Sequence, residues 1–156
     1  MATFTPVVSE PLLILFGTLI AFCANFILHY MNNRQRQKHS ASILLHDLLS
    51  IEYYLHRDEN DLLGDRVANL RYTENWQRLV AECSFLKERQ VQVLYKVYDN
   101  VYEYNHLFPI ETAADPDLKN WLYKGNRPLA KLKRTIADDE WAALIDCLKR
   151  KSGAVE

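Results

Sequence analysis

The chain has 156 residues, 49% of them hydrophobic, and a formal net charge of −1 at pH 7, which is typical of one globular domain with or without an appendage. Only four glycines and five prolines are present, and long stretches lack both, which excludes a turn-rich β fold and favours helices. The three cysteines, Cys23, Cys83 and Cys147, have neither the number of a disulfide framework nor the spacing of a metal site, so we expect reduced thiols of a cytosolic protein.

An uncharged segment of twenty residues runs from Pro11 to Tyr30. As an α-helix rising about 1.5 Å per residue, it would span about 30 Å, the thickness of the hydrocarbon core of a bilayer. Only Thr18, Asn25 and His29 interrupt it, whereas a helix buried in a soluble core would show a polar face. No Lys or Arg precedes the segment and no small-residue cleavage site follows it, which argues against a secretory signal. We therefore predict that residues 1–33 form an N-terminal tail and a retained transmembrane helix.

Three basic residues, Arg34, Arg36 and Lys38, follow the predicted transmembrane helix directly, while residues 1–10 contain no Lys or Arg. Positive charge beside a membrane span stays on the cytoplasmic side. The N-terminus should therefore lie outside and the rest of the chain in the cytosol, as in a single-pass protein of the bacterial inner membrane. The three side chains could instead only reach up to the lipid headgroups, which is compatible with the same topology.

Small residues gather on one side of the predicted transmembrane helix. Gly17, Ala21 and Ala24 are spaced by four and three residues, and Asn25 is adjacent. Small residues let two helix backbones approach, and an amide can donate a hydrogen bond across them. The pattern predicts a homo-oligomer that associates in the lipid bilayer through this side; the alternative is that these are ordinary residues of a span.

Residues 34–156 are predicted to form one cytosolic helical domain. Its first helix, the stalk helix 40–57, lacks Gly and Pro and carries an apolar stripe spaced by four, three and four residues: Leu44, Leu48, Ile51 and Leu55. This stripe is typical of one helix of a bundle, and no helix-breaking residue separates it from the transmembrane helix. The predicted fold class is therefore all-α, with one N-terminal transmembrane helix that continues into a compact cytosolic helical domain.

The remainder of the domain, residues 66–151, is predicted to be a bundle of helices. A turn at 57–65 precedes it, and Asp115, Pro116, Gly125, Pro128 and Asp138 mark further helix starts and stops. The expected elements are a helix over 66–87 that breaks or bends at Tyr72–Thr73, a helix over 87–108, a linker over 109–117, a short helix over 116–124, a helix that opens at Pro128, and a final helix over 139–151.

Charge is distributed unevenly along the predicted domain. Residues 47–118 hold 14 acidic and 7 basic residues, a net charge of −7, and residues 119–151 hold 4 acidic and 9 basic residues, a net charge of +5. Such asymmetry has two interpretations. The acidic helices and the basic segment could pack together, within one protomer or between protomers, or the basic segment could bind an anionic ligand.

The sequence WLYKGNRPLAKLKR, residues 121–134, is the densest candidate for an anion site. Loop amides at a helix start together with Lys and Arg side chains are the groups that bind phosphate, and an aromatic ring beside them could stack on a base. The predicted ligand-binding residues are Tyr123, Lys124, Asn126, Arg127, Lys131 and Arg134. The alternative is that these basic side chains only form a solvated helix face.

Motifs of catalysis are missing from the sequence. It contains no P-loop, G-x-G-x-x-G, H-E-x-x-H or G-x-S-x-G pattern. His39 and His46 are seven residues apart on the predicted stalk helix, and a metal centre there would need carboxylates such as Asp47 or Glu52 to converge with them. We therefore expect no enzyme, no cofactor and no metal site.

In its architecture the chain resembles the small membrane effectors of prokaryotic antiviral defence. The resemblance is carried by the uncharged PLLILFGTLIAFCANFILHY, the basic NNRQRQK and the basic WLYKGNRPLAKLKR, and it is greatest for the CRISPR-associated effectors of type III systems. It implies that a cyclic oligoadenylate, or another anionic small ligand, binds between protomers of a homo-oligomer and that the membrane segment then perturbs the inner membrane. Double-stranded nucleic acid is not expected as a partner.

A second hypothesis stays open beside this ligand-gated effector. A membrane-tethered scaffold or a superinfection-exclusion type of protein would have the same anchor, and its helical domain would bind a protein partner and no small ligand.

Overall fold

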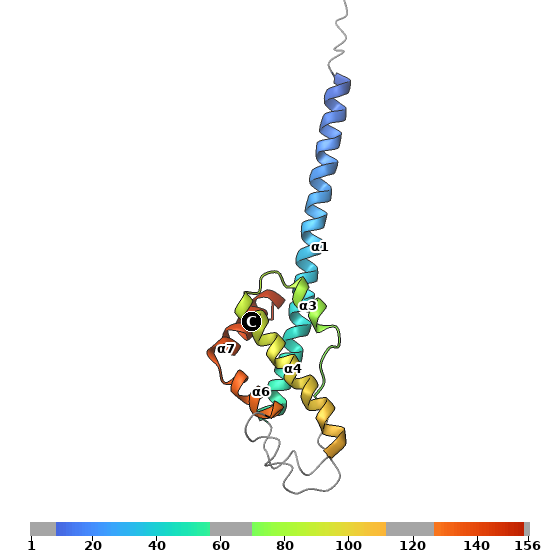
Figure 1. Ribbon diagram of the computed structural model, residues 1–156. Helices are drawn as coiled ribbons and strands as arrows, with labels where there is room; N and C mark the ends of the chain where they lie inside the picture. The colour runs from blue at the N-terminus through green and yellow to red at the C-terminus, as the bar shows by residue number, and fades with distance from the viewer. Residues whose placement is uncertain (1–8, 57–69, 112–126, 155–156) are drawn as a thin grey trace, which may run out of the picture. The chain divides into compact units, whose positions relative to one another are not determined.

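The computed structural model describes residues 9–56, 70–111 and 127–154, and every regular element in these ranges is an α-helix (Figure 1). The predicted all-α class is therefore confirmed for the part of the chain that the structure describes. The chain divides into two compact units, Met1–Arg36 and Gln37–Glu156. The turn predicted at 57–65 and the short helix predicted at 116–124 lie outside the described residues.

Helix α1 (Ser9–His56) contains the apolar segment and the predicted stalk helix without an interruption. The residues from Leu12 to Arg36 are exposed all round the helix. From Ser40 onward one side becomes buried, and Leu44, Leu48, Ile51 and Leu55 are at most 5% exposed. This confirms the predicted stripe and the continuation of the apolar helix into the domain.

Helix α3 (Trp76–Glu82) is much shorter than the helix predicted over 66–87. Residues 70–75 are not helical, because side chains of other helices satisfy their backbone groups. The Thr73 amide donates to Asp47 of α1 at 2.8 Å, and the amide of Leu70 donates to Asn105 at 2.9 Å while its carbonyl accepts from the same side chain at 2.9 Å. At the other end the backbone leaves the helical region at Cys83 (ψ 60°). The predicted helix is therefore wrong for residues 70–75 and from Cys83 to residue 87, whereas the predicted alternative of a break at Tyr72–Thr73 agrees with a helix that starts at Trp76. Residues 66–69 are outside the described part.

Helix α4 (Glu88–Glu111) confirms the helix predicted over 87–108 and ends three residues later, beyond Pro109. The predicted linker therefore does not begin at residue 109. Leu94, Tyr98 and Val101 recur at helical spacing and are buried. The buried side of α4 also includes Val93, Val97 and Tyr104, which are at most 4% exposed.

Helices α6 (Pro128–Ile136) and α7 (Asp139–Ser152) both pack against α4. Pro128 occupies the first turn of α6, where no amide hydrogen is needed. The Asp138 carboxylate accepts a hydrogen bond from the Glu140 amide at 3.3 Å and so caps α7 as predicted. The end of α7 is closed by Gly153 in the left-handed conformation, φ 73°. The single core of the domain is drawn from all five helices.

We expect the replacement Leu94→Ala to lower the free energy of unfolding of the domain by about 2–5 kcal/mol, because Leu94 is fully buried and its loss leaves a cavity. The matched control is Gln92→Ala on the same helix, whose side chain is exposed and donates a 3.4 Å hydrogen bond to Glu88. The control should change the free energy by about 0.5 kcal/mol or less. Denaturant unfolding of the full-length protein in detergent, followed by tryptophan fluorescence, measures both. Equal effects of the two variants would contradict the assigned core.

Candidate functional site

Of the six residues predicted to bind an anion, the structure describes three, Arg127, Lys131 and Arg134. Arg127 is the N-cap residue of α6, with an extended backbone of φ −69° and ψ 155°. Lys131 and Arg134 follow after four and seven residues, so all three occupy the same side of α6. Leu129 and Leu132 belong to the core and hold the helix in place. The other predicted residues, Tyr123, Lys124 and Asn126, lie outside the described residues.

Lys131 forms an ion pair with Glu103 of α4, with 3.4 Å between Nζ and Oε2. The two side chains are 41% and 47% exposed, so the pair is screened by water and is worth about 0–1 kcal/mol. Glu103 belongs to the acidic part of the chain and Lys131 to the basic part. Their ion pair is a contact of the kind expected if the acidic and basic parts pack together. A weak pair of this kind still allows a phosphate group to compete for Lys131.

The small residues predicted to associate in the membrane are accessible in the single chain. A Cβ atom added at Gly17 would meet no atom within 4 Å, and Ala21, Ala24 and Asn25 are exposed. The neighbouring Thr18 hydroxyl donates to the Leu15 carbonyl at 2.9 Å and is thereby satisfied within its own helix. This side of α1 is therefore available to a second helix.

Helix α1 is long and apolar enough to cross a membrane, by length and composition alone. No residue of its apolar window is buried. Thirteen large hydrophobic side chains from Leu12 to Met31 are at least 46% exposed, which is far more apolar surface than a soluble monomer presents. A signal sequence and a core helix of a soluble protein can have the same length and composition, so these features are weak evidence for a single-pass membrane protein.

No group of three or more metal-binding side chains comes together among the residues that the structure describes. Glu103 and His106 have the Glu-x-x-His spacing that occurs in metal-binding helix bundles. They have other contacts, however: Glu103 pairs with Lys131, and the His106 ring lies 2.9 Å from the Tyr102 carbonyl.

A buried polar cluster at Asp47 is the main feature that the sequence interpretation missed. The Asp47 carboxylate, 8% exposed, accepts hydrogen bonds from the Thr73 amide and from the Tyr98 hydroxyl at 3.3 Å. The Tyr98 ring stacks on Trp76 with centroids 4.5 Å apart. Burial, and then the nearby Asp47 charge, raise the pKa of the Tyr98 hydroxyl above its usual value. The one available signal was the position of an acid beside the apolar stripe of α1, and the structure shows a packing role for it.

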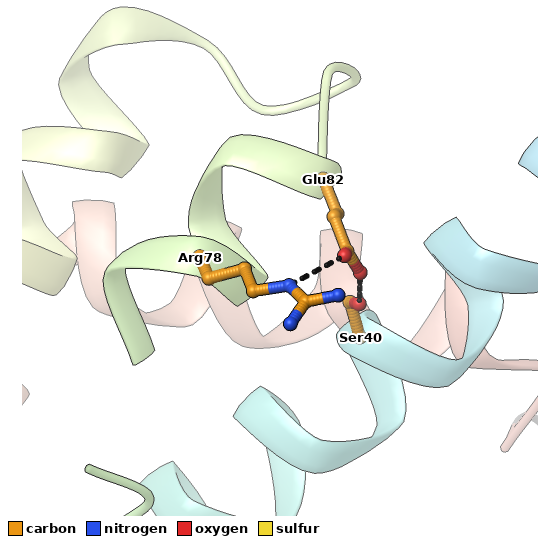
Figure 2. Close-up of polar contacts among 3 residues, drawn as sticks. All are labelled: Ser40, Arg78 and Glu82. Atoms are coloured by element: carbon orange, nitrogen blue, oxygen red, sulfur yellow. Dashed lines mark hydrogen bonds and ion pairs between the residues drawn. The ribbon is translucent and has the colours of Figure 1, made fainter. Parts of the chain in front are cut away.

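A second group of hydrogen bonds that the sequence interpretation missed joins α3 to α1 (Figure 2). The fully buried Ser40 hydroxyl donates to one oxygen of Glu82 at 2.5 Å, and Arg78 Nε donates to the other at 3.3 Å. Gln37 Nε2 of α1 donates to the Ser84 hydroxyl, directly after α3, at 2.9 Å. The hydrogen bonds of Ser40 and Gln37 join segments 42 and 47 residues apart, and they explain why the short α3 holds its place on the domain.

Comparisons with known proteins return no relative, since no family model, no curated protein and no solved structure matches this chain.

We expect the domain to lose stability in alkaline solution. Burial, followed by the charge of Glu82 and by Cys147, raises the pKa of the Cys83 thiol from 9.0 to about 12. Because the folded value lies above the unfolded one, the contribution of this thiol is complete below pH 9 and is lost as the pH rises toward 12. The melting temperature of the full-length protein in detergent should therefore fall above pH 9.

The variant Cys83→Ala should show a shallower fall of the melting temperature with pH than the unchanged protein. Cys23→Ala serves as the control, because the Cys23 thiol is exposed; Cys147 is unsuitable, because its charge contributes to the raised pKa of Cys83. An identical fall in all three proteins would contradict the buried thiol.

Proposed function

We propose that this protein is a single-pass, membrane-anchored effector whose cytosolic helical domain binds an anionic ligand and acts on the membrane. The observation that carries the proposal is the exposed apolar length of α1. Thirteen large hydrophobic side chains that are exposed in the described structure are stable in lipid and costly in water. A bilayer is the environment that suits them.

The basic residues after the apolar segment give the orientation. Arg34, Arg36 and Lys38 are exposed, and cationic side chains beside a span are retained on the cytoplasmic side. This orientation gives an external N-terminus and a cytosolic helical domain in the bacterial inner membrane.

The ligand site that we propose is the basic side of α6. Arg127, Lys131 and Arg134 present three cationic side chains at one side of a helix that the core holds in place, and an anion bound there would make charge-assisted hydrogen bonds. The resemblance to type III CRISPR-associated membrane effectors supplies the ligand class, a cyclic oligoadenylate, and the expected outcome, a change in the inner membrane. The weak pair of Lys131 with Glu103 is compatible with displacement by phosphate.

A second candidate function is a membrane-tethered scaffold for a protein partner. It is favoured by two observations. Lys131 is already paired within the fold, and Tyr95 and Tyr102 of α4 are 44% and 54% exposed. Exposed tyrosines are enriched at protein interfaces because they combine a large apolar ring with a polar tip.

We expect cyclic tetra-adenylate to bind the full-length protein in lipid nanodiscs, and the double variant Arg127→Ala with Arg134→Ala to weaken that binding. Loss of one charge-assisted contact costs about 1.5–3 kcal/mol, or about tenfold to a hundredfold in affinity. Lys96→Ala, an exposed lysine of α4, is the control and should leave the affinity unchanged. Isothermal titration and the melting temperature are measured on the same preparations.

Two outcomes would contradict the ligand site. A double variant that melts early but binds normally assigns these arginines to packing. A wild-type protein that binds no cyclic oligonucleotide leaves the scaffold as the remaining candidate.

A further inference from the structure

The exposed residues of α1 after Lys38 include no Asp, Glu, Lys or Arg; Lys38 itself is exposed, and Glu52 is half-buried. These exposed residues form a side that we call the α1 face: His39, Ser42, His46, Leu49, Ser50, Tyr53 and His56. Leu49 is 39% exposed and Tyr53 is 72% exposed. Solvated helix faces of soluble domains are usually covered with charged side chains.

Other helices of the same domain follow that usual rule. The exposed charged residues of α4 are Glu88, Arg89, Lys96, Asp99 and Glu103, and those of α7 are Asp139, Asp146, Lys149, Arg150 and Lys151. The absence of charge from the α1 face is therefore a local property of this face and not of the composition of the domain.

The spacing of the α1 face is that of a helix which packs against another helix along its length. His39, Ser42, His46, Leu49, Tyr53 and His56 follow one another at intervals of three, four, three, four and three residues. Paired parallel helices have this 3.5-residue spacing with apolar residues along the seam; here Leu49 and Tyr53 are the apolar members, and His39, Ser42, His46 and His56 are polar. The opposite side of α1 is occupied by the core of its own domain, so the α1 face is the side left for a partner.

The same repeat, counted back along the sequence, reaches the membrane segment. It passes through Gln35, Asn32, Leu28, Asn25, Ala21 and Thr18, of which none is charged. Asn25 and Ala21 belong to the small-residue patch of the predicted span, and Thr18 and Asn25 are two of its three polar residues. The three basic residues Arg34, Arg36 and Lys38 fall outside this repeat.

We infer that the α1 face pairs with the same face of a second copy of this chain, with the two α1 helices parallel. The charges permit this pairing, because the residues that meet carry no fixed charge. In the parallel register Lys38 lies beside Ile43 of the other copy and Arg36 beside Met31, so no like charges face each other. Two charged faces such as those of α4 or α7 would repel or require a precise pairing of signs.

The area of the α1 face indicates how the pair is stabilised. The 18 residues from His39 to His56 extend for about 27 Å, and one helix pair of this length is below the usual size of a free, stable dimer interface, about 1,200–2,000 Å². Two chains anchored in one membrane are held parallel and at a high effective concentration, which makes a small interface sufficient. The inference rests on the membrane anchor of the proposed function and needs no ligand.

Cysteine cross-linking in membranes tests the pairing. In full-length protein carrying Cys23→Ser and Cys147→Ser, the additional change His46→Cys or Tyr53→Cys should give a disulfide-linked species of twice the chain mass on mild oxidation. Lys96→Cys on α4 is the matched exposed control and should cross-link about tenfold less. A species of any other mass at position 46 or 53 would identify a different partner and overturn the inference.

Charge inserted into the α1 face is the second test. Leu49→Lys with Tyr53→Lys places like charges in the pair, which opposes association strongly, and should lower the cross-linked fraction at position 46 by about tenfold. Tyr102→Lys, at an exposed tyrosine of α4, should leave it unchanged. Since Leu49 and Tyr53 are outside the core, the melting temperature should stay the same.

Two results would overturn the pairing. Persistence of the cross-link at position 46 in the double lysine variant would place the association elsewhere in the chain. If no cross-link forms in a chain that resists extraction from membranes by alkaline carbonate, the pairing is refuted but the membrane anchor is supported. If the chain is extracted by alkaline carbonate, both the pairing and the membrane anchor are refuted.

Discussion

Helix α1 must satisfy two environments along its length, and the remaining structure depends on how it does so. From Leu12 to Arg36 its side chains are exposed all round, which suits lipid. From Ser40 onward one side is buried by α3, α4, α6 and α7, and the exposed residues carry no fixed charge. The domain core is thus assembled on the same helix that provides the proposed membrane anchor. Pairing of the α1 face with the same face of another copy of the chain would explain why this face lacks charge.

Polar contacts of buried side chains, rather than local helix propensity, decide where α3 begins and ends. Pro128 and Asp138 marked the starts of α6 and α7, and apolar periodicity predicted the part of α1 that belongs to the core. It failed over 66–87, where Asp47 and Asn105 bind backbone groups of the intervening segment from 26 and 35 residues away. A carboxylate that accepts a distant amide leaves no local pattern, so a sequence cannot reveal it. The same holds for Ser40 and Glu82, 42 residues apart.

The candidate site was predictable as a charge distribution but not as a set of contacts. The sequence placed Arg127 in the loop and Lys131 and Arg134 on the helix that follows it, and in the structure Arg127 is the N-cap residue directly before α6. It could not predict that Glu103, 28 residues earlier, would pair with Lys131, because the pairing follows from the packing of α6 on α4. The α1 face was also overlooked in the sequence, since its seven residues become recognisable only when the other sides of α1 are known to be buried. In both cases the decisive information is which side of a helix the core occupies.

The central claim, that the first part of α1 lies in a bilayer, can be tested most directly at the native Cys23. This thiol is exposed on α1 in the middle of the apolar segment. We therefore expect that only lipid shields it from water. We expect a membrane-impermeant maleimide to leave Cys23 unlabelled in intact cells and in cells opened without detergent, and to label it once detergent is added. Labelling of Cys23 in opened cells without detergent would show that water reaches this segment and would contradict the account.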